Sequence, residues 1–294
     1  MISIVIPVHN YLVLNLVKTI VHQISATDID YEIICLDDAS TNIEIINQNF
    51  EIQNFKNCFY YTNQTNLGRT QTRTLLAKKA KFDWLLFLDA DVIPANETFI
   101  SNYISFLNTD NDVVFGGYKY YDFHTDKNTI LRWKFGKKRE SQSAEERNKN
   151  PYNFLFSGNV LIRKDTFLSI PFPEKNHYGM DLFFCYNLLK MNAKTVHIDN
   201  PIYHLGLESN TVFFKKSLEA VENRVRYLAE VQEAENLNSF LKYYTKLKQY
   251  RLLSIVGFGF KLVEPILKYF ILSKNPSIFC FDLYRLGYIC HKTS

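Results

Sequence analysis

The first hundred residues alternate short apolar runs with segments of helical periodicity, and this alternation most constrains how the 294-residue chain can fold. Ile2 to Val8 is nearly all apolar, as expected of a strand buried on both faces. Three similar runs follow, and we predict strands at 31–36, 58–61 and 82–88, with helices at 12–24, after 42, and from 66 to 81. This order predicts an α/β fold with a mostly parallel sheet joined by right-handed crossovers.

Charge is unevenly distributed along the chain. Residues 1–100 carry a net charge of −4, residues 101–209 of +2 and residues 210–294 of +6, which together give the +4 of the whole chain. An acidic first third argues against nucleic-acid binding, whereas a basic tail rich in aromatic residues suits an anionic membrane surface. Ordinary solvated helix faces are the alternative for the tail.

Cysteine usage and the N-terminus favour a cytoplasmic protein. The five cysteines are widely spaced and include no C-x-x-C pair, which favours reduced thiols over a disulfide framework or a zinc site. The chain runs straight into its first apolar stretch with no basic leader or cleavage site, so we expect no signal peptide.

Polar residues follow three of the predicted strands. His9 and Asn10 come after the first, Asp37-Asp38 after the second, and Asp89 and Asp91 after the fourth. Because ligands of such sheets bind beyond the carboxyl ends of the strands, we expect a site at this edge. Two nearby carboxylates suit a hard cation such as Mn²⁺ or Mg²⁺ together with ligand phosphates, although a solvated turn is the alternative.

A phosphate-bearing ligand is also indicated by Arg69 and Arg73. These residues lie four apart at the start of a predicted helix, where they share one face and can bind anions. Surface ion pairs are the alternative. The chain has no G-x-x-x-x-G-K-[ST] motif and no G-x-G-x-x-G after its first strand, so metal and arginine would hold the phosphates.

Taken together, these stretches resemble the family 2 glycosyltransferases with the GT-A fold. The matching stretches are Ser3 to Asn10, Leu36 to Ser40, Asn66-Leu67-Gly68 with Arg73, and Leu88 to Asp91, in the same order and at similar spacing over roughly residues 1–210. The resemblance implies an α/β nucleotide-diphospho-sugar transferase fold, here with a helical C-terminal extension. It also implies a nucleotide-sugar donor, usually a UDP-sugar, and inversion at the anomeric carbon.

The resemblance assigns donor and metal roles to individual residues. Pro7, Val8, His9 and Asn10 would line the nucleoside pocket, Asp38 would accept from the uracil or a ribose contact, and Arg73 would assist base or phosphate binding. Gly68, Arg69 and Ala90 also fall in the donor site, with Asp89 near the ribose and the metal. Asp91 would be the direct ligand of a divalent cation, and His204 would complete the metal site.

The second half supplies the acceptor side of the resemblance. Gly158 and Asn159 lie in a stretch similar to the strand that faces the acceptor. In Tyr178-Gly179-Met180-Asp181, Met180 replaces the usual Glu, which puts acceptor hydrogen bonding in doubt, whereas Asp181 keeps the place of the general base. At the start of a helix the dipole helps to keep this carboxylate ionised. A plain helix cap is the alternative for Asp181.

We divide the chain into a catalytic domain at 1–212, with a nucleotide-binding half (1–107) and an acceptor half (108–212), and a helical extension at 213–294. Residues 132–151 are polar and charge-dense, which predicts a lid or a solvated loop. The apolar run 252–272 contains three charges and a proline, so we expect an interfacial helix rather than a spanning one, or else a helix pair packed on the catalytic domain.

The leading hypothesis is a bacterial-type inverting glycosyltransferase that extends a surface polysaccharide on a glycan or lipid-linked acceptor, peripheral to the inner face of the cell membrane. A non-catalytic scaffold subunit that binds nucleotide-sugar at the membrane is the alternative. A nucleotidyltransferase is disfavoured because the first strand is not followed by a Gly-rich basic loop.

Overall fold

The computed structural model describes residues 1–154, 157–173, 178–231 and 237–294. The chain forms two compact units. The first consists of Met1–Lys119, Gln142–Asn176 and Leu188–Gly206, and the second of Tyr120–Ser141, His177–Asn187 and Leu207–Ser294. This division differs from the predicted boundary at 212, because residues 120–141 and 177–187 group with the C-terminal part.

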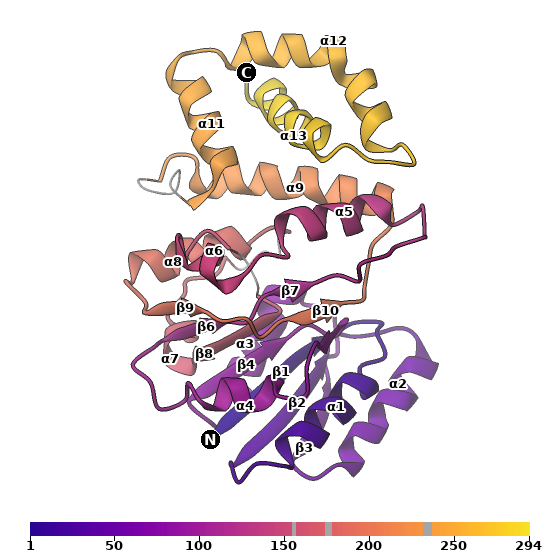
Figure 1. Ribbon diagram of the computed structural model, residues 1–294, viewed down its shortest axis with the longest axis vertical. Coiled ribbons are helices and arrows are strands. Elements are labelled where there is room, and N and C mark those ends of the chain that lie inside the picture. The colour runs from indigo at the N-terminus through magenta and orange to yellow at the C-terminus, as the bar shows by residue number, and fades with distance from the viewer. Residues whose placement is uncertain (155–156, 174–177, 232–236) are drawn as a thin grey trace. The chain divides into compact units, whose positions relative to one another are not determined.

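A seven-stranded sheet forms the centre of the first unit (Figure 1). Its strand order is β3-β2-β1-β4-β8-β6-β9. The strands are β1 (Ile2–Val8), β2 (Tyr31–Asp37), β3 (Cys58–Thr62), β4 (Trp84–Leu88), β6 (Val113–Phe115), β8 (Asn159–Arg163) and β9 (Thr195–His197). Strands β1 to β4 pair in parallel, while β8 runs antiparallel to β4 and β6. The predicted α/β fold with a mostly parallel sheet is confirmed.

Helices pack on the sheet because β1 is apolar along nearly its whole length. Ile2, Ile4 and Ile6 alternate along the strand and share one buried cluster with Val17 and Ile20 of the first helix. The helical elements of this unit are α1 (Leu14–Ile24), α2 (Ile43–Phe50), η1 (Glu51–Asn54), α3 (Arg69–Lys79), α4 (Phe99–Ile104), α6 (Ala144–Asn148) and α7 (Lys164–Leu168). The helices predicted at 12–24, after 42 and within 66–81 are confirmed.

A second, three-stranded sheet carries a late segment of the chain back to the end of β4. Its strands are β5 (Val92–Pro94), β10 (Ile202–His204) and β7 (Tyr118–Lys119), in the order β5-β10-β7. The antiparallel register pairs His204 with Val92, the residue that follows Asp91. The backbone N–H of Leu205 then donates to Asp91 O at 2.8 Å. Residues 204 and 91 are thereby brought together.

The second unit is helical and has an aromatic core. Phe213, Phe214, Phe260 and Phe281 belong to one buried cluster, with Phe214 and Phe281 stacked at 6.0 Å. Its helices are α5 (Ile130–Arg139), α9 (Asn210–Leu228), α11 (Ser239–Gln249), α12 (Leu253–Ile271) and α13 (Ile278–Thr293), and α8 (Asp181–Lys190) begins here. Within the described ranges, none of the helices combines the length and apolar character needed to cross a membrane.

The solvated loop that was one alternative for 132–151 is wrong, because most of this segment is helical and two of its arginines are held by internal contacts. A lid role stays a prediction. Arg132 pairs with Glu140 at 3.1 Å, and both side chains are largely covered. Arg147 is 1% exposed and donates to the carbonyl oxygens of Ile198 at 2.7 Å and Gly116 at 3.3 Å. Gly117 makes room for this guanidinium, since a Cβ there would meet it.

Candidate active site

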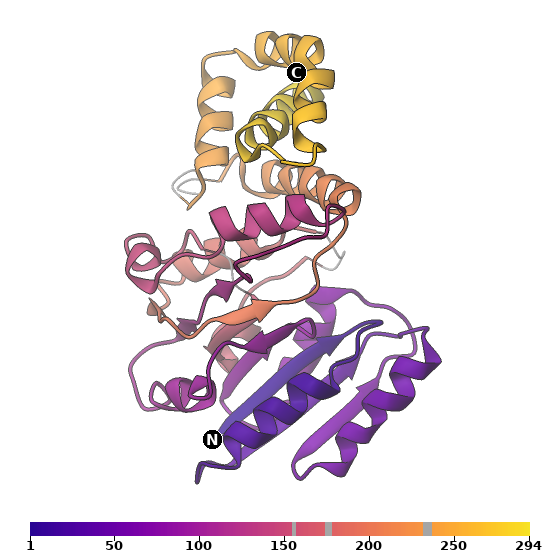
Figure 2. The same ribbon diagram turned by 45° about the vertical axis from the view of Figure 1, so that its right-hand side comes forward.

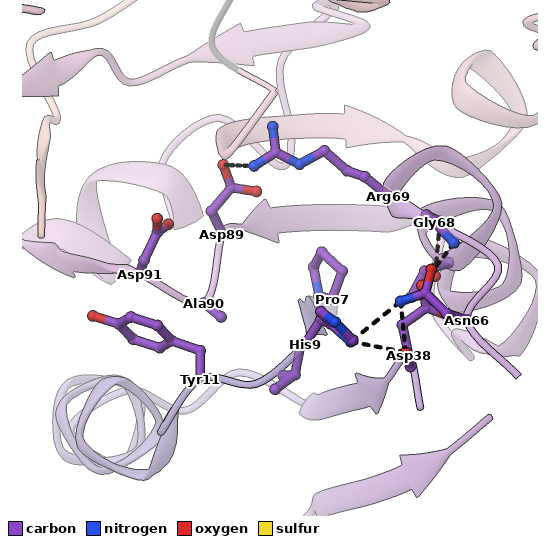
Figure 3. Close-up of a pocket in the computed structure, with 12 residues that line it drawn as sticks. Pro7, His9, Tyr11, Asp38, Asn66, Gly68, Arg69, Asp89, Ala90 and Asp91 are labelled. Atoms are coloured by element: carbon purple, nitrogen blue, oxygen red, sulfur yellow. Dashed lines mark hydrogen bonds and ion pairs between the residues drawn. The ribbon is translucent and has the colours of Figure 1, made fainter. Parts of the chain in front are cut away.

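The ends of β1, β2 and β4 and the start of α3 enclose a pocket of about 320 Å³ in the first unit (Figure 3). Its lining residues are Pro7, Val8, His9, Tyr11, Asp38, Asn66, Gly68, Arg69, Thr72, Asp89, Ala90 and Asp91. Nine of these twelve are among the residues predicted for the donor and metal sites. The pocket lies where an open parallel sheet binds its ligands, beyond the carboxyl ends of the strands.

One end of the pocket is organised by Asp38. Its buried carboxylate accepts from Asn63 Nδ2 at 2.9 Å, from Leu67 N at 2.9 Å and from Gly68 N at 2.7 Å. Gly68 has φ +81°, a left-handed conformation that glycine adopts without strain. Asp38 therefore anchors the turn that leads into α3, and much of its acceptor capacity is used inside the protein.

His9 and Asn66 line the same end of the pocket and share a contact with Asp38. His9 Nδ1 lies 3.0 Å and Asn66 Nδ2 3.1 Å from Asp38 O. Dashed lines mark these contacts in Figure 3. Asn10, predicted beside His9, is not among the lining residues. Its Oδ1 accepts from Thr41 N at 2.9 Å and Asn42 N at 3.2 Å, so Asn10 ties the loop after β2 to the end of β1.

The other end of the pocket is charged. Asp89 is buried and accepts from Arg73 Nη2 at 2.5 Å, with Arg69 Nη2 at 3.6 Å. Burial alone would raise the pKa of the Asp89 carboxyl, but Arg69, Arg73 and His204 outweigh it and hold that pKa below its usual range. Arg73 is buried and does not line the pocket; it reaches the ligand end only through Asp89, whereas Arg69 is half exposed and lines it.

Asp91 and His204 face each other beside this charged end. Asp91 Oδ2 lies 3.4 Å from His204 Nε2, and both side chains are mostly covered. A Cβ on Gly206 would meet the Asp91 carboxylate, and one on Gly158 would meet that of Asp89. Tyr11 lies near Asp91; burial first, and then the Asp91 carboxylate, raise the pKa of its phenol. Its hydroxyl therefore keeps its proton and can donate.

The arrangement of Asp91 and His204 fits a divalent cation. No group of three or more His, Cys, Asp or Glu side chains suited to an ion occurs in the described part of the chain, so protein ligands alone do not form a full shell. Two ligands of an octahedral ion at about 2.1 Å and at a right angle lie about 3 Å apart, close to the observed 3.4 Å. A carboxylate plus an imidazole suits Mn²⁺, with the remaining positions left for ligand phosphates and water.

The predicted acceptor residues have mixed surroundings. Asn159 is fully buried, donates to Gly117 O at 2.8 Å and Asn200 O at 3.0 Å, and accepts from Tyr103 at 2.7 Å. These bonds argue against a direct contact between its side chain and an acceptor. Gly158, whose carbonyl accepts from Asp89 N at 3.1 Å, lies beside the charged end of the pocket.

Asp181 and Met180 belong to the second unit, where α9 holds the segment before them. Tyr178 N donates to Glu219 Oε1 at 3.2 Å, and Asn223 Nδ2 donates to Tyr178 O at 3.0 Å. Asp181 is half-buried in the first turn of α8, as predicted, while Met180 is buried.

Three lining residues, Tyr11, Asn66 and Thr72, were not predicted as ligand-binding residues. Asn66 and Thr72 lie within the stretch that carries the resemblance, with Thr72 four residues after Gly68 on the same helix face. Tyr11 directly follows His9-Asn10, so its position beyond the first strand was the available signal.

Comparison with known proteins agrees with this geometry. A model of glycosyl transferase family 2 matches residues 3–168, more than half of the chain. No curated protein sequence matches the chain significantly.

Solved structures match along most of the chain at low sequence identity. S. aureus TarS 1–349 in complex with UDP-GlcNAc is 17% identical with a TM-score of 0.53, covering 98% of this chain and 90% of that one. The mannosyltransferase PcManGT from Pyrobaculum calidifontis, in complex with GDP-Man and Mn²⁺, is 11% identical with a TM-score of 0.60, covering 99% and 87%.

Glucosyl-3-phosphoglycerate synthase from Mycobacterium tuberculosis, in complex with Mn²⁺, UDP and glucosyl-3-phosphoglycerate, is 16% identical with a TM-score of 0.53, covering 77% of this chain and 79% of that one. At these identities the likeness shows a shared GT-A fold. With the matched family model, it follows that the chain belongs to glycosyl transferase family 2.

Proposed function

We propose that the protein transfers a sugar from a UDP-sugar to a hydroxyl group of a glycan or lipid-linked oligosaccharide in surface polysaccharide synthesis, with inversion at the anomeric carbon and with a divalent cation. One observation carries this proposal. Asp91 and His204 face each other at 3.4 Å at the end of a pocket whose neighbouring carboxylate, Asp89, is already neutralised by two arginines.

The two ends of the pocket suit the two parts of a nucleotide-sugar. His9, Asn66 and the turn held by Asp38 present planar and polar groups to a base and ribose. At the other end, Arg69 and the Tyr11 hydroxyl can donate to diphosphate oxygens. Three of the similar structures contain UDP-GlcNAc, GDP-Man or UDP, which supports a nucleoside-diphosphate ligand in the same fold.

Asp91 and His204 would hold the cation, as the Mn²⁺ in two of the similar structures suggests. The ion would supply positive charge to the diphosphate as it leaves. Asp89 contributes differently: because it is buried between arginines, it fixes Arg69 and Arg73 rather than offering a free carboxylate. Arg69, held beside Asp89, would then contribute positive charge where the diphosphate binds.

Asp181 would take the proton from the attacking acceptor hydroxyl. It lies half-buried in the first turn of α8, and a carboxylate can act as a general base toward a hydroxyl within its reach. Replacing Asp181 by Asn should lower the turnover rate by about 10²- to 10⁴-fold. Binding of UDP to the first unit should not change, and equilibrium titration with UDP measures that separately.

The direct test is UDP release from a panel of UDP-sugars with candidate acceptors. We expect release with at least one donor, dependent on Mn²⁺ and abolished in Asp91→Ala. Tight UDP binding without turnover across all donors and acceptors would contradict the proposal and favour a non-catalytic scaffold subunit. The same proposal includes a peripheral contact of the C-terminal extension with an anionic membrane on the cytoplasmic side, where lipid-linked acceptors would be found.

A further inference from the structure

Helix α12 carries a second apolar face in addition to the one it packs inside the helical unit. Five large side chains recur at intervals of three or four residues and so share one side of the helix. They are Ile255 (68% exposed), Phe258 (70%), Leu262 (68%), Ile266 (58%) and Tyr269 (73%). In both views α12 lies at the edge of this unit (Figures 1 and 2). We call these five residues the outer stripe.

The opposite side of α12 already supplies the contacts that folding needs. Phe260 is buried against Tyr284 of α13, with ring centroids 5.0 Å apart, and Gly287 leaves room for its ring. Gly257 lies so close to the backbone of His291 that a Cβ would clash with it. The outer stripe is therefore not part of this core, and a contiguous apolar patch of this kind marks an interaction surface.

The charges beside the outer stripe are positive. Lys261 and Lys268 lie seven residues apart on one flank of it, and both are exposed. The acidic residue of α12, Glu264, accepts from Tyr284 OH of α13 at 2.9 Å, and its other carboxylate oxygen lies 3.7 Å from Lys261 Nζ. Across residues 240–294 the chain has nine Lys and Arg against two acids. Lysine stems can lie along apolar surface while their ammonium groups reach polar headgroups.

We infer that the outer stripe of α12 docks on an anionic lipid bilayer, with the helix lying in the plane of the interface. A second copy of the chain is the less suitable occupant, because a two-fold interface would set the basic flank against itself. Anionic headgroups complement that flank, and Tyr269, next to Phe270, suits the headgroup level. This inference deepens the membrane part of the proposed function and does not depend on the chemistry of the pocket.

Flotation with vesicles tests the inference on the full chain. With vesicles of phosphatidylcholine and about 30 mol% phosphatidylglycerol, we expect the wild type to float, and with phosphatidylcholine alone to float weakly or not at all. The triple variant Phe258→Ser, Leu262→Gln, Ile266→Gln should lose about 100-fold in partitioning. Lys261→Gln with Lys268→Gln should lose roughly 30-fold, and high salt should weaken wild-type binding.

The matched control removes equally exposed apolar side chains elsewhere. Ile43→Gln, Phe50→Ser and Phe123→Ser change residues that are 72%, 59% and 90% exposed, and this variant should float like the wild type. Circular dichroism checks that all variants are folded. Wild-type flotation by the stripe variant would overturn the inference, as would absence of wild-type flotation.

Measuring self-association tests whether a second copy of the chain, rather than a membrane, covers the outer stripe. If the wild type forms a concentration-dependent dimer that the stripe variant abolishes, the surface is an interface between copies and the inference fails. UDP release with a soluble acceptor is measured in parallel. Lost flotation with retained release supports the membrane surface, and flotation without any release would leave this surface standing while the transferase proposal fails.

Discussion

The first unit buries charged side chains, whereas the second exposes large apolar ones. In the first, the carboxylates of Asp38 and Asp89 are drawn inside and held by three and two donor groups respectively. In the second, the outer stripe of α12 leaves large apolar side chains in solvent. A buried charge is costly unless it is paired, and an exposed apolar patch is unusual unless something binds it. Each unit departs from ordinary packing at the place where we propose that it meets a ligand.

The largest effect we expect is on catalysis at the Asp91 end of the pocket, where we propose that a cation binds. Asp91→Asn keeps the shape of the side chain and removes its charge, so Mn²⁺-dependent UDP release should fall about 10³-fold or more. Asp110→Asn, which removes a side chain's charge where it is 91% exposed, is the control and should keep wild-type activity. Equal losses in both variants would contradict a special role for Asp91.

The next effect is the loss of stability when the buried carboxylate of Asp89 is made neutral. Asp89→Asn leaves Arg73 buried without its partner, and the free energy of unfolding should fall by about 3 kcal/mol. Trp84 in β4 and Trp133 in α5 are the two tryptophans, so in a Trp133→Phe background fluorescence reports the first unit in a urea titration.

The stabilisation by the Asp89 carboxylate should also be visible in the pH dependence of the unfolding free energy. Because the folded pKa of Asp89 is lowered, its contribution is fully present above the ordinary carboxyl value near 3.9 and is lost as pH falls through the folded value. The urea concentration at the unfolding midpoint of the wild type should therefore fall as the pH is lowered below about 4. In Asp89→Asn the part of this fall that comes from the Asp89 carboxyl should be missing. An unchanged acid dependence in the variant would show that Asp89 is not stabilised by the arginines.

A smaller effect tests how closely the backbone approaches the ligand residues. In Gly206→Ala the new Cβ would displace the Asp91 carboxylate, so Mn²⁺-dependent activity should fall about 100-fold. The free energy of unfolding should fall as well, because the new Cβ would lie 2.7 Å from both Cβ and Cγ of Asp91 and not only near its terminal oxygens. Activity equal to that of the wild type would mean that Asp91 has more freedom than its contacts indicate.

The smallest effect compares two glycines two residues apart in α12. A Cβ added at Gly259 would point into open space, so Gly259→Ala should stabilise the helix by up to about 1 kcal/mol. In Gly257→Ala the Cβ would meet the backbone of His291, 2.8 Å away, and we expect destabilisation instead. Thermal unfolding followed by circular dichroism compares the two variants, and a change of the same sign in both would contradict the packing of α12 on α13.

The alternation of strand and helix could be predicted because local periodicity reports burial directly. β1 is buried on both faces and reads as a continuous apolar run, and the polar residues after β1, β2 and β4 do converge on one pocket. Segment 132–151 could not be predicted in the same way. Its charge density suggested solvent, whereas Arg147 is buried by partners about fifty residues away in the sequence, on which local composition carries no information.

The same limit applies inside the candidate site. Arg73 was expected to touch the ligand, but only the three-dimensional arrangement shows that it lies behind Asp89, with Arg69 in front. Tyr11 was not predicted because an aromatic residue after a strand is usually part of the core. Its place near Asp91, which marks it as a pocket residue, is visible only in the structure. The basic composition of the tail indicated a membrane surface, but which side chains of α12 would form it depends on which side packs on α13.

The antiparallel pairing of β5 with β10 has a consequence for how the protein matures. Asp91 is synthesised long before His204, and the two meet only after a segment more than a hundred residues downstream has left the ribosome and paired with β5. The turn that Asp38 organises needs no residue beyond Gly68 and can form early. A nascent chain can thus form the Asp38 end of its pocket before Asp91 and His204 meet, so the contact between these two side chains becomes a late marker of completed folding.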